Sequence, residues 1–384
     1  MKKETLKLSF LMLILMLYSC QKERPNEPDQ PEQVDVYVAG FVSDDANYHY
    51  PDINPYGNSN DHPTYWKNGR PVQLDYGDFL PDGNNKSGRA LSIAVSGNIV
   101  YVTGYGTWTN DVVWHLPYGM FWKNSIPLDP DSMNIWGTRE VNSLAVSNND
   151  TYTVGWGQSD RATYWKNENQ IELTPPYSST GLNISATATS IAVSGNDVYV
   201  SGPQRAQLSP VGGFSNVTAE YWKNGDAVNL SDGAIDTYTT SIAVSGNYVY
   251  VAGSDKNGIA KFWKNGNLVN LTDGSTAAEA NSIAVSGTDV YVAGTQWDGN
   301  SIQYNNGINY TRNPIAKYWK NGIPVNLTDG SKWAEARSIV ISGNDVYVAG
   351  FEDAVAKYWK NGNPVILGDA SKNSEAYSIF LVKH

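Results

Sequence analysis

A serine recurs at the start of a repeated Ser-Ile-Ala-Val phrase, and charged side chains, most of them acidic, stand at a fixed distance before it. These are the first residues in the sequence that could do chemistry. Three residues before that serine stand one arginine and four glutamates: Arg89, Glu140, Glu279, Glu335 and Glu375. Grouped carboxylates could bind a cation or a polar ligand, or flank a bond to be cleaved. Alternatively, each glutamate could cap its own loop by accepting backbone hydrogen bonds. The repetition predicts that these side chains surround one mouth of a channel.

Tryptophans outside the repeats form a second candidate set. Seven of the thirteen tryptophans recur at fixed places in a repeat, and six do not. Flat aromatic rings stack on sugar faces or anchor protein partners, so the irregular tryptophans could mark a binding surface. They could equally fold back and order their own loops. The candidate ligand-binding residues are Trp108, Trp114, His115, Trp136, Trp297 and Trp333.

His115 and His49 are candidates for general bases. A histidine beside a tyrosine or Arg139 would suit β-elimination on an acidic polysaccharide. The spacing of these residues is not diagnostic, and the sequence contains no Gly-x-Ser-x-Gly, no His-Glu-x-x-His and no phosphate loop. No catalytic residue is therefore assigned, and we expect neither a cofactor nor a metal ion.

The elements that would position these residues are repeats. The phrase Tyr-Trp-Lys-Asn, twice with Phe for Tyr, occurs seven times at steps of about 40 or about 56 residues, a range typical of propeller blades. Three more phrases recur in constant order: Ser-Ile-Ala-Val-Ser-Gly, Val-Tyr-Val-Ala-Gly and a short segment resembling Pro-Val-x-Leu. Each is rich in β-branched and aromatic residues and is bounded by turn residues, which predicts four strands per repeat.

The order of the phrases predicts an all-β, seven-bladed β-propeller with four antiparallel strands per blade. The chain starts with a second strand at Val36 and ends with a first strand at Ser378, so the C-terminal strand should join the N-terminal three and close the ring. Adjacent Tyr and Trp point to opposite faces of a strand, and both can be buried only if each blade lies between two others. The seven repeated tryptophans are therefore predicted to be core.

The two ends of such a ring should differ. Tight Asn-Gly and Gly-Asn turns join the first strand to the second and the third to the fourth, so one face should be uniform. The other face should carry the crossovers and four long loops between second and third strands, at 41–64, 105–120, 203–220 and 295–316. All six irregular tryptophans map to this long-loop face.

The N-terminal residues predict export. Lys2 and Lys3 precede an apolar run too short to span a membrane, followed by Ser19-Cys20. This pattern resembles the lipobox of bacterial lipoproteins, which implies cleavage before Cys20 and lipidation there. The alternative is an ordinary signal peptide in which Cys20 is incidental. We therefore expect a signal peptide at 1–19, a lipidated Pro- and acid-rich tether at 20–34 and the propeller at 35–384, anchored in the cell envelope at the outer membrane.

Charge and composition exclude other classes of function. The net charge is −11 and no run of Lys or Arg exists, so nucleic acid is excluded as a partner. The single cysteine cannot form a disulfide within the chain. We expect a monomer, with the membrane as one partner through Cys20 and a polysaccharide or an envelope protein as another.

The repeated phrases also resemble a known family. Ala-Lys-Tyr-Trp-Lys-Asn-Gly, followed by the Ser-Ile-Ala-Val and Val-Tyr-Val-Ala-Gly phrases, is similar to the HAF-type repeats of bacterial extracellular proteins, and the N-terminal region resembles that of Bacteroidota envelope lipoproteins. The resemblance implies a propeller-like fold outside the cytoplasm and no particular activity. Three hypotheses follow: a propeller that binds glycan or protein through its long-loop face, a polysaccharide-processing lyase or hydrolase on the same face, or a structural scaffold.

Overall fold

The structure is a computed structural model. It describes residues 33–44, 60–79, 85–109, 117–130, 138, 140–156, 161–174, 183–209, 212–297 and 313–384. Two compact units are distinguished, one comprising 1–34 with 383–384 and the other Asp35–Val382. The second unit contains the repeats, and it is all β.

The described strands form seven sheets, here called blades 1 to 7 in the order of the Tyr-Trp-Lys-Asn phrases. Blade 1 contains β29 (Ser374–Lys383), β1 (Val34–Ser43), β2 (Asp61–Lys67) and β3 (Arg70–Gln73). Blade 2 contains β4 (Asn85–Ser96), β5 (Ile99–Thr109), β6 (Tyr118–Lys123) and β7 (Ile126–Pro127). Blade 3 contains β8 (Val141–Ser147), β9 (Asp150–Trp156), β10 (Ala162–Lys166) and β11 (Asn169–Glu172).

Blade 4 contains β12 (Ile184–Ala186), β13 (Ser190–Ser194), β14 (Asp197–Ala206), β15 (Thr218–Lys223) and β16 (Asp226–Asn229). Blade 5 contains β17 (Thr237–Ser245), β18 (Tyr248–Asp255), β19 (Ala260–Lys264) and β20 (Asn267–Asn270). Blade 6 contains β21 (Ala278–Ser286), β22 (Asp289–Gln296), β23 (Ile315–Lys320) and β24 (Ile323–Asn326). Blade 7 contains β25 (Ala334–Ser342), β26 (Asp345–Glu352), β27 (Val355–Lys360) and β28 (Asn363–Ile366).

The predicted ring closure is confirmed. β29 pairs with β1, so the last strand completes the first blade. Seven apolar clusters lie between successive blades, and one of them joins blade 7 to blade 1. Each repeated tryptophan is almost fully buried and packs against the preceding blade, as Trp66 does against Tyr347 of blade 7. Burial on both faces of every sheet therefore explains why adjacent Tyr and Trp are tolerated in β2 and its equivalents.

The repeated serine of the first strand joins neighbouring blades by a hydrogen bond. Its Oγ accepts the backbone N–H of the residue that follows the serine of the next blade, as Ser92 does from Leu144 at 3.1 Å. The same bond occurs at all seven interfaces, at 3.1 to 3.4 Å, and its last member runs from Ile93 back to Ser378. The serine is thus part of the closure of the ring.

The Asn-Gly turns explain the uniform face of the ring, here called the tight-turn face. The asparagine after each Trp-Lys has a positive φ, between 48° and 53°. Its side-chain oxygen accepts a backbone N–H from the start of the second strand, as Asn224 does from Val198 at 2.8 Å. In five blades the preceding lysine pairs with an aspartate of that strand, as Lys223 does with Asp197 at 2.9 Å.

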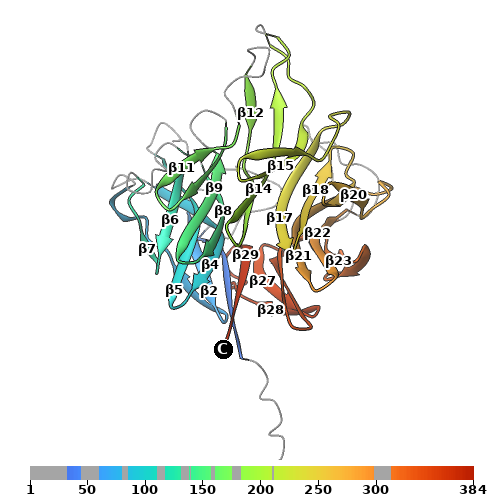
Figure 1. Ribbon diagram of the computed structural model, residues 1–384. Coiled ribbons are helices and arrows are strands. Elements are labelled where there is room, and N and C mark those ends of the chain that lie inside the picture. Colours follow the sequence, from blue (N-terminus) through green and yellow to red (C-terminus); the bar gives the residue numbers. More distant parts are fainter. Residues whose placement is uncertain are drawn as a thin grey trace, which may run out of the picture. The chain divides into compact units, whose positions relative to one another are not determined.

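Blade 4 departs from the predicted four strands. Its first strand is divided into β12 and β13, and β14 continues beyond its repeated glycine, Gly202, to pair with β12. β12 consequently lies beyond β14 and β15 at the top of Figure 1. The described residues contain one helical element, the 3-10 turn η1 (Gly77–Phe79), and no helix long and apolar enough to cross a bilayer.

Candidate binding face

The residues three positions before the repeated serine lie where first strands begin, at the end of the ring opposite the tight turns. We call the seven of them the pre-serine ring: Arg89, Glu140, Thr187, Tyr238, Glu279, Glu335 and Glu375. The repeated glycine of each second strand fixes their backbone. A Cβ on Gly294 would lie 1.9 Å from the carbonyl oxygen of Glu279, and each of the other six glycines meets its own ring residue at 1.9 to 2.1 Å. The sequence therefore holds the backbone of this ring constant while its side chains vary.

Arg89 is the centre of a buried polar cluster between blades 1 and 2. Its Nε and Nη2 donate to Asp61 Oδ2 at 3.0 and 2.9 Å, and Nη1 donates to the hydroxyl of Tyr377 at 3.0 Å. Its guanidinium also lies 4.4 Å from the centre of the Phe41 ring. Tyr377 in turn donates to Glu375 Oε2 at 2.8 Å. Two of the predicted residues, Arg89 and Glu375, are thus joined through a tyrosine that the sequence analysis did not select.

Arg337 extends this cluster into blade 7. Its Nη2 lies 2.7 Å from Glu335 Oε2 and 3.7 Å from Glu375 Oε2. The guanidinium is 5.6 Å from the ring centre of Phe351 and 5.1 Å from that of Tyr377. Arginines and aromatic rings consequently alternate across blades 7, 1 and 2, an arrangement in which cation–π attraction supplements the ion pairs.

Tyr377 and Arg337 share a position that sequence reasoning missed, directly before the repeated serine. In the first strands of five blades the pairing register shifts between the residues on either side of it, so this residue is a β-bulge. At this position Asn142, Thr240 and Asn281 bond to a backbone carbonyl of the next blade. The signal was a position of varied, mostly polar type inside an otherwise apolar phrase.

Burial perturbs the acidic groups of the cluster. It raises the pKa of Glu375, against the opposing effect of Arg337 and Arg89. It raises the pKa of Asp61 in spite of the adjacent Arg89, and it raises the pKa of Glu279, where the charge of Glu335 adds to the effect. Burial also holds the pKa of Tyr377 well above its ordinary value, which keeps the hydroxyl protonated as a donor. Among the described residues, no group of three or more His, Cys, Asp or Glu is placed to hold a metal ion.

Four large apolar side chains of blades 4 and 5 are exposed on the same face, and together they are here called the apolar patch. It consists of Leu208, Phe214, Ile235 and Tyr238. The end of the blade 4 hairpin carries the first two, and Asn216 ties this hairpin to the crossover by donating to the carbonyls of Gly233 and Ala234 at 2.9 and 3.1 Å. The Arg205 guanidinium lies 4.4 Å from the centre of the Phe214 ring. The patch therefore presents an aromatic ring supported on one side by a cation.

The described tryptophans do not form an exposed set. Trp297 was expected to be one of the exposed rings of the long-loop face, but it is only 8 % exposed, so its ring packs within the fold. Trp333 is half-buried and donates from Nε1 to Glu335 Oε1 at 3.2 Å, which joins it to the pre-serine ring. Other predicted site residues lie outside the described residues, or have side chains that do: Cys20, His49, Trp108, Trp114, His115, Trp136 and Arg139.

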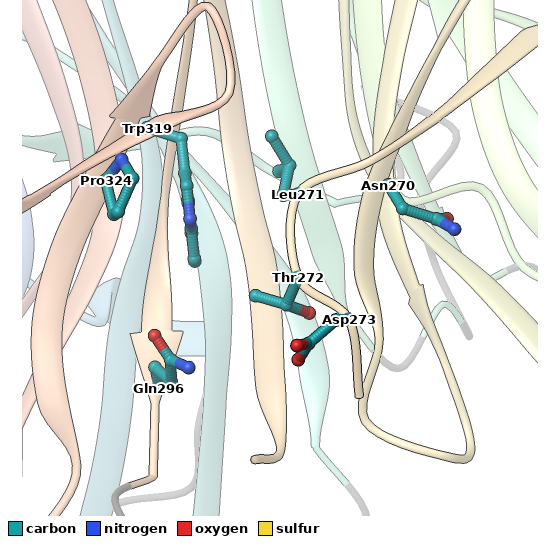
Figure 2. A pocket seen from close by; sticks show the side chains of 7 residues that line it. All are labelled: Asn270, Leu271, Thr272, Asp273, Gln296, Trp319 and Pro324. Carbon is teal, nitrogen blue, oxygen red and sulfur yellow. The ribbon is translucent and has the colours of Figure 1, made fainter. Parts of the chain in front are cut away.

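A surface pocket of about 560 Å³ opens between blades 5 and 6. Its lining residues are Asn270, Leu271, Thr272 and Asp273 from blade 5 and Gln296, Trp319 and Pro324 from blade 6. Figure 2 shows the side chains of Thr272 and Asp273 extending toward the side occupied by Gln296, with Trp319 seen edge-on. This pocket could not be predicted from the sequence, because its two walls come from different repeats that are brought together only in the folded ring.

Comparison with known proteins adds a repeat type to the fold. A model of the LVIVD repeat matches residues 87–108, 236–258 and 334–354. These segments coincide with the pairs of first and second strands in blades 2, 5 and 7. The match supports LVIVD repeats in this chain, and the HAF-type resemblance stays a prediction. No curated protein sequence matches the chain.

Solved structures with similar folds include three enzymes or enzyme-like proteins of low sequence identity. A puromycin-hydrolyzing peptidase of Mycobacterium tuberculosis has 11 % identity and a TM-score of 0.44, over 72 % of this chain and 46 % of that one. A mutant of Trypanosoma rangeli sialidase displaying trans-sialidase activity has 9 % identity and a TM-score of 0.39, over 91 % and 52 %. A neuraminidase-like protein of the strain A/flat-faced bat has 8 % identity and a TM-score of 0.39, over 76 % and 88 %. The chain spans about half the length of the first two.

Proposed function

We propose that this protein is an envelope-anchored binding propeller that recognises a glycan or a protein through its long-loop face. The observation that carries the proposal is the exposed apolar patch of Leu208, Phe214, Ile235 and Tyr238 beside the pre-serine ring. Large apolar side chains exposed on one face of a protein favour a binding site there, because their contact with water is unfavourable. Aromatic rings such as Phe214 and Tyr238 suit both the apolar face of a sugar and a protein partner.

The anchor belongs to the same proposal. A signal peptide at 1–19 would direct export and be removed, and a lipid on Cys20 would then hold the propeller at the outer membrane through the tether at 20–34. Asp35, the first residue of the propeller, lies on the tight-turn face, where its carboxylate accepts a hydrogen bond from Asn68 at 2.8 Å and pairs with Lys67 at 3.1 Å. Asp35 and the apolar patch therefore belong to opposite faces of the ring.

The test is retention of the full chain, in detergent, by gels containing neutral or acidic polysaccharides. We expect the double variant Phe214→Ala/Tyr238→Ala to weaken retention at least tenfold. Tyr248→Ala is the matched control, because Tyr248 is 49 % exposed on the tight-turn face and Tyr238 is 43 % exposed on the long-loop face. We expect it to change retention less than twofold.

Other outcomes separate the competing hypotheses. New reducing ends or unsaturated sugars in the polysaccharide would show that the protein cleaves it. The processing hypothesis would then replace the binding hypothesis. Equal retention of the double variant and the control would place the binding site elsewhere. Absence of retention by the unaltered chain would remove glycan as its partner. Crosslinking on whole cells, compared between the double variant and Tyr248→Ala, then tests a protein partner at the same patch.

A further inference from the structure

The pocket between blades 5 and 6 has an internal control elsewhere in the ring. The segment Asn-Leu-Thr-Asp-Gly-Ser forms one wall of it at 270–275, and the same six residues recur at 326–331 between blades 6 and 7. The local structure recurs as well: Thr272 and Thr328 each accept a backbone N–H at 3.1 Å, from Ala260 and Ala316. What differs between the two interfaces is therefore the facing wall.

The facing wall at blade 7 is built from ion pairs. Glu352, at the end of β26, accepts from Lys357 at 2.6 Å, and Lys332 of the crossover pairs with Asp353 at 2.7 Å. The corresponding crossovers of blades 5 and 1 also carry an ion pair, Lys256 with Asp236 and Lys372 with Asp44. Paired charges close to a pocket hold water and compete for a ligand's polar groups.

At blade 6 two of the charged side chains are replaced by uncharged ones, while Lys317 keeps the place of Lys357. Gln296 replaces Glu352 and Thr276 replaces Lys332, and the Gln296 amide donates to Thr276 Oγ1 at 2.5 Å. Gln296 Oε1 accepts from the buried Lys317, so both ends of the amide are fixed. The side chains of this wall that line the pocket, Gln296, Trp319 and Pro324, carry no charge themselves, and Leu271 adds an apolar side chain from blade 5.

Asp273 supplies the single carboxylate among the described lining residues. Hydrogen bonds from Ser275 lower its pKa, one of them from the backbone N–H at 2.9 Å, so the group is ionised at neutral pH. A carboxylate accepts several hydrogen bonds, so the remaining capacity is available to a ligand. The volume of about 560 Å³ lies within the roughly 300–1,000 Å³ of small-molecule sites.

We propose that this pocket is a subsite for a neutral sugar residue. Vicinal hydroxyls of the sugar donate to the Asp273 carboxylate, the side chain of Asn270 offers an amide, and the apolar side chains of Leu271, Pro324 and Trp319 contact a C–H face of the sugar. An acidic sugar is disfavoured, because its carboxylate would face that of Asp273 at short distance. The inference rests on the proposed glycan-binding function and adds the class of sugar and its place.

The test uses the full chain in detergent on gels of neutral dextran, mannan or xylan and of acidic alginate or polygalacturonate. One neutral polysaccharide will retain the unaltered chain most strongly. We expect Asp273→Ala to weaken retention by that polysaccharide at least tenfold. Asp329→Ala removes the same turn carboxylate at the other interface, with the same hydrogen bond from a serine N–H at 2.8 Å, and should change retention less than twofold. Asp273→Asn preserves the turn and should still weaken retention several-fold, which guards against a folding defect.

Each outcome decides between the subsite and the wider function. If Asp273→Ala and Asp329→Ala weaken retention on the neutral polysaccharide equally, the subsite is overturned. Glycan binding by the protein would still stand. Stronger retention by the acidic polysaccharides overturns the assignment to a neutral sugar. Absence of retention by every polysaccharide overturns both proposals, and the crosslinking comparison at the apolar patch then decides whether a protein partner remains.

Discussion

The two faces of the ring use the same repeated backbone for different purposes. On the tight-turn face, the same side chains recur with the same partners: asparagine caps the next strand, and lysine pairs with aspartate in five blades. On the long-loop face, the repeated glycine holds each pre-serine residue in place, but the side chain at that position is arginine, glutamate, threonine or tyrosine. The repeated side chains of the tight-turn face thus stabilise the fold. The varied side chains of the long-loop face, held on a constant backbone, are the ones that could form a binding site.

The faces also differ in how their charges are solvated. Arg89 and Asp61 are buried, whereas Lys67 and its tight-turn equivalents are about half exposed. A buried charge depends on its partner, because water cannot replace that partner. Exposed pairs gain little, because water solvates either partner almost as well.

The largest effect is expected at the buried pair. Arg89→Ala leaves the Asp61 carboxylate buried without its cation, and we expect the free energy of unfolding to fall by about 3–5 kcal/mol. Urea denaturation of the purified chain measures it. The double variant Arg89→Ala/Asp61→Ala should recover part of the loss, because the uncompensated charge is gone. A double variant no more stable than Arg89→Ala would contradict the ion-pair explanation.

A smaller effect is expected in the tight turns. Asn224 has a φ of 53°, and it bonds to Val198 N–H and to Asp197 Oδ1. Asn224→Ala loses both bonds and places a Cβ in a left-handed conformation, so we expect a loss of about 1–3 kcal/mol by urea denaturation. Asn224→Gly should cost less, because glycine tolerates that backbone. Lys223→Ala removes the exposed pair to Asp197 and a cation–π contact with Tyr199, and it should have the smallest effect of the three.

The fold could be predicted from the sequence because its information is local and repeated. Alternating apolar strands, Asn-Gly turns and the matching terminal strands specify seven closed blades without any knowledge of tertiary contacts. The division of the first strand in blade 4 was missed, because the sequence at 186–193 keeps the alanines and the Ser-Ile-Ala-Val phrase of the other blades. The repeated serine was noticed, but its bond to the next blade requires a neighbour about 40 to 60 residues away.

The candidate site was predicted less completely, for a physical reason. The offset from the serine placed Arg89 and Glu375 at one end of their strands, but their connection runs through Tyr377, which is 288 residues from Arg89. Composition could not distinguish Trp297, whose ring is buried, from an exposed tryptophan. The pocket was not predictable, because Gln296 matters only in comparison with Glu352 at the equivalent place in the next blade.

The smallest predicted effect is a difference in the response of the two faces to pH. Burial raises the pKa of Glu375 in the folded state, so its contribution to stability is fully present below the unfolded pKa and is lost as the pH rises through the folded value. The tight-turn Asp197, Asp289 and Asp345 have lowered pKa values, owing chiefly to hydrogen bonds from the neighbouring lysine and asparagine. Their contribution is present above the unfolded pKa and is lost as the pH falls through the folded value.

Acid should therefore weaken the tight-turn face, and rising pH should weaken the cluster around Glu375. Glu375→Gln removes the buried ionisation, and we expect it to flatten the decline in stability between the unfolded pKa and the raised folded pKa, by at most about 1.36 kcal/mol per pH unit. The measurement is a series of urea midpoints from about pH 2 to about pH 8, beside Asp197→Asn as the control that flattens only the acid side. If both variants kept the slope of the unaltered chain, ionisation in these two regions would not be what separates them, and the contrast would rest on packing alone.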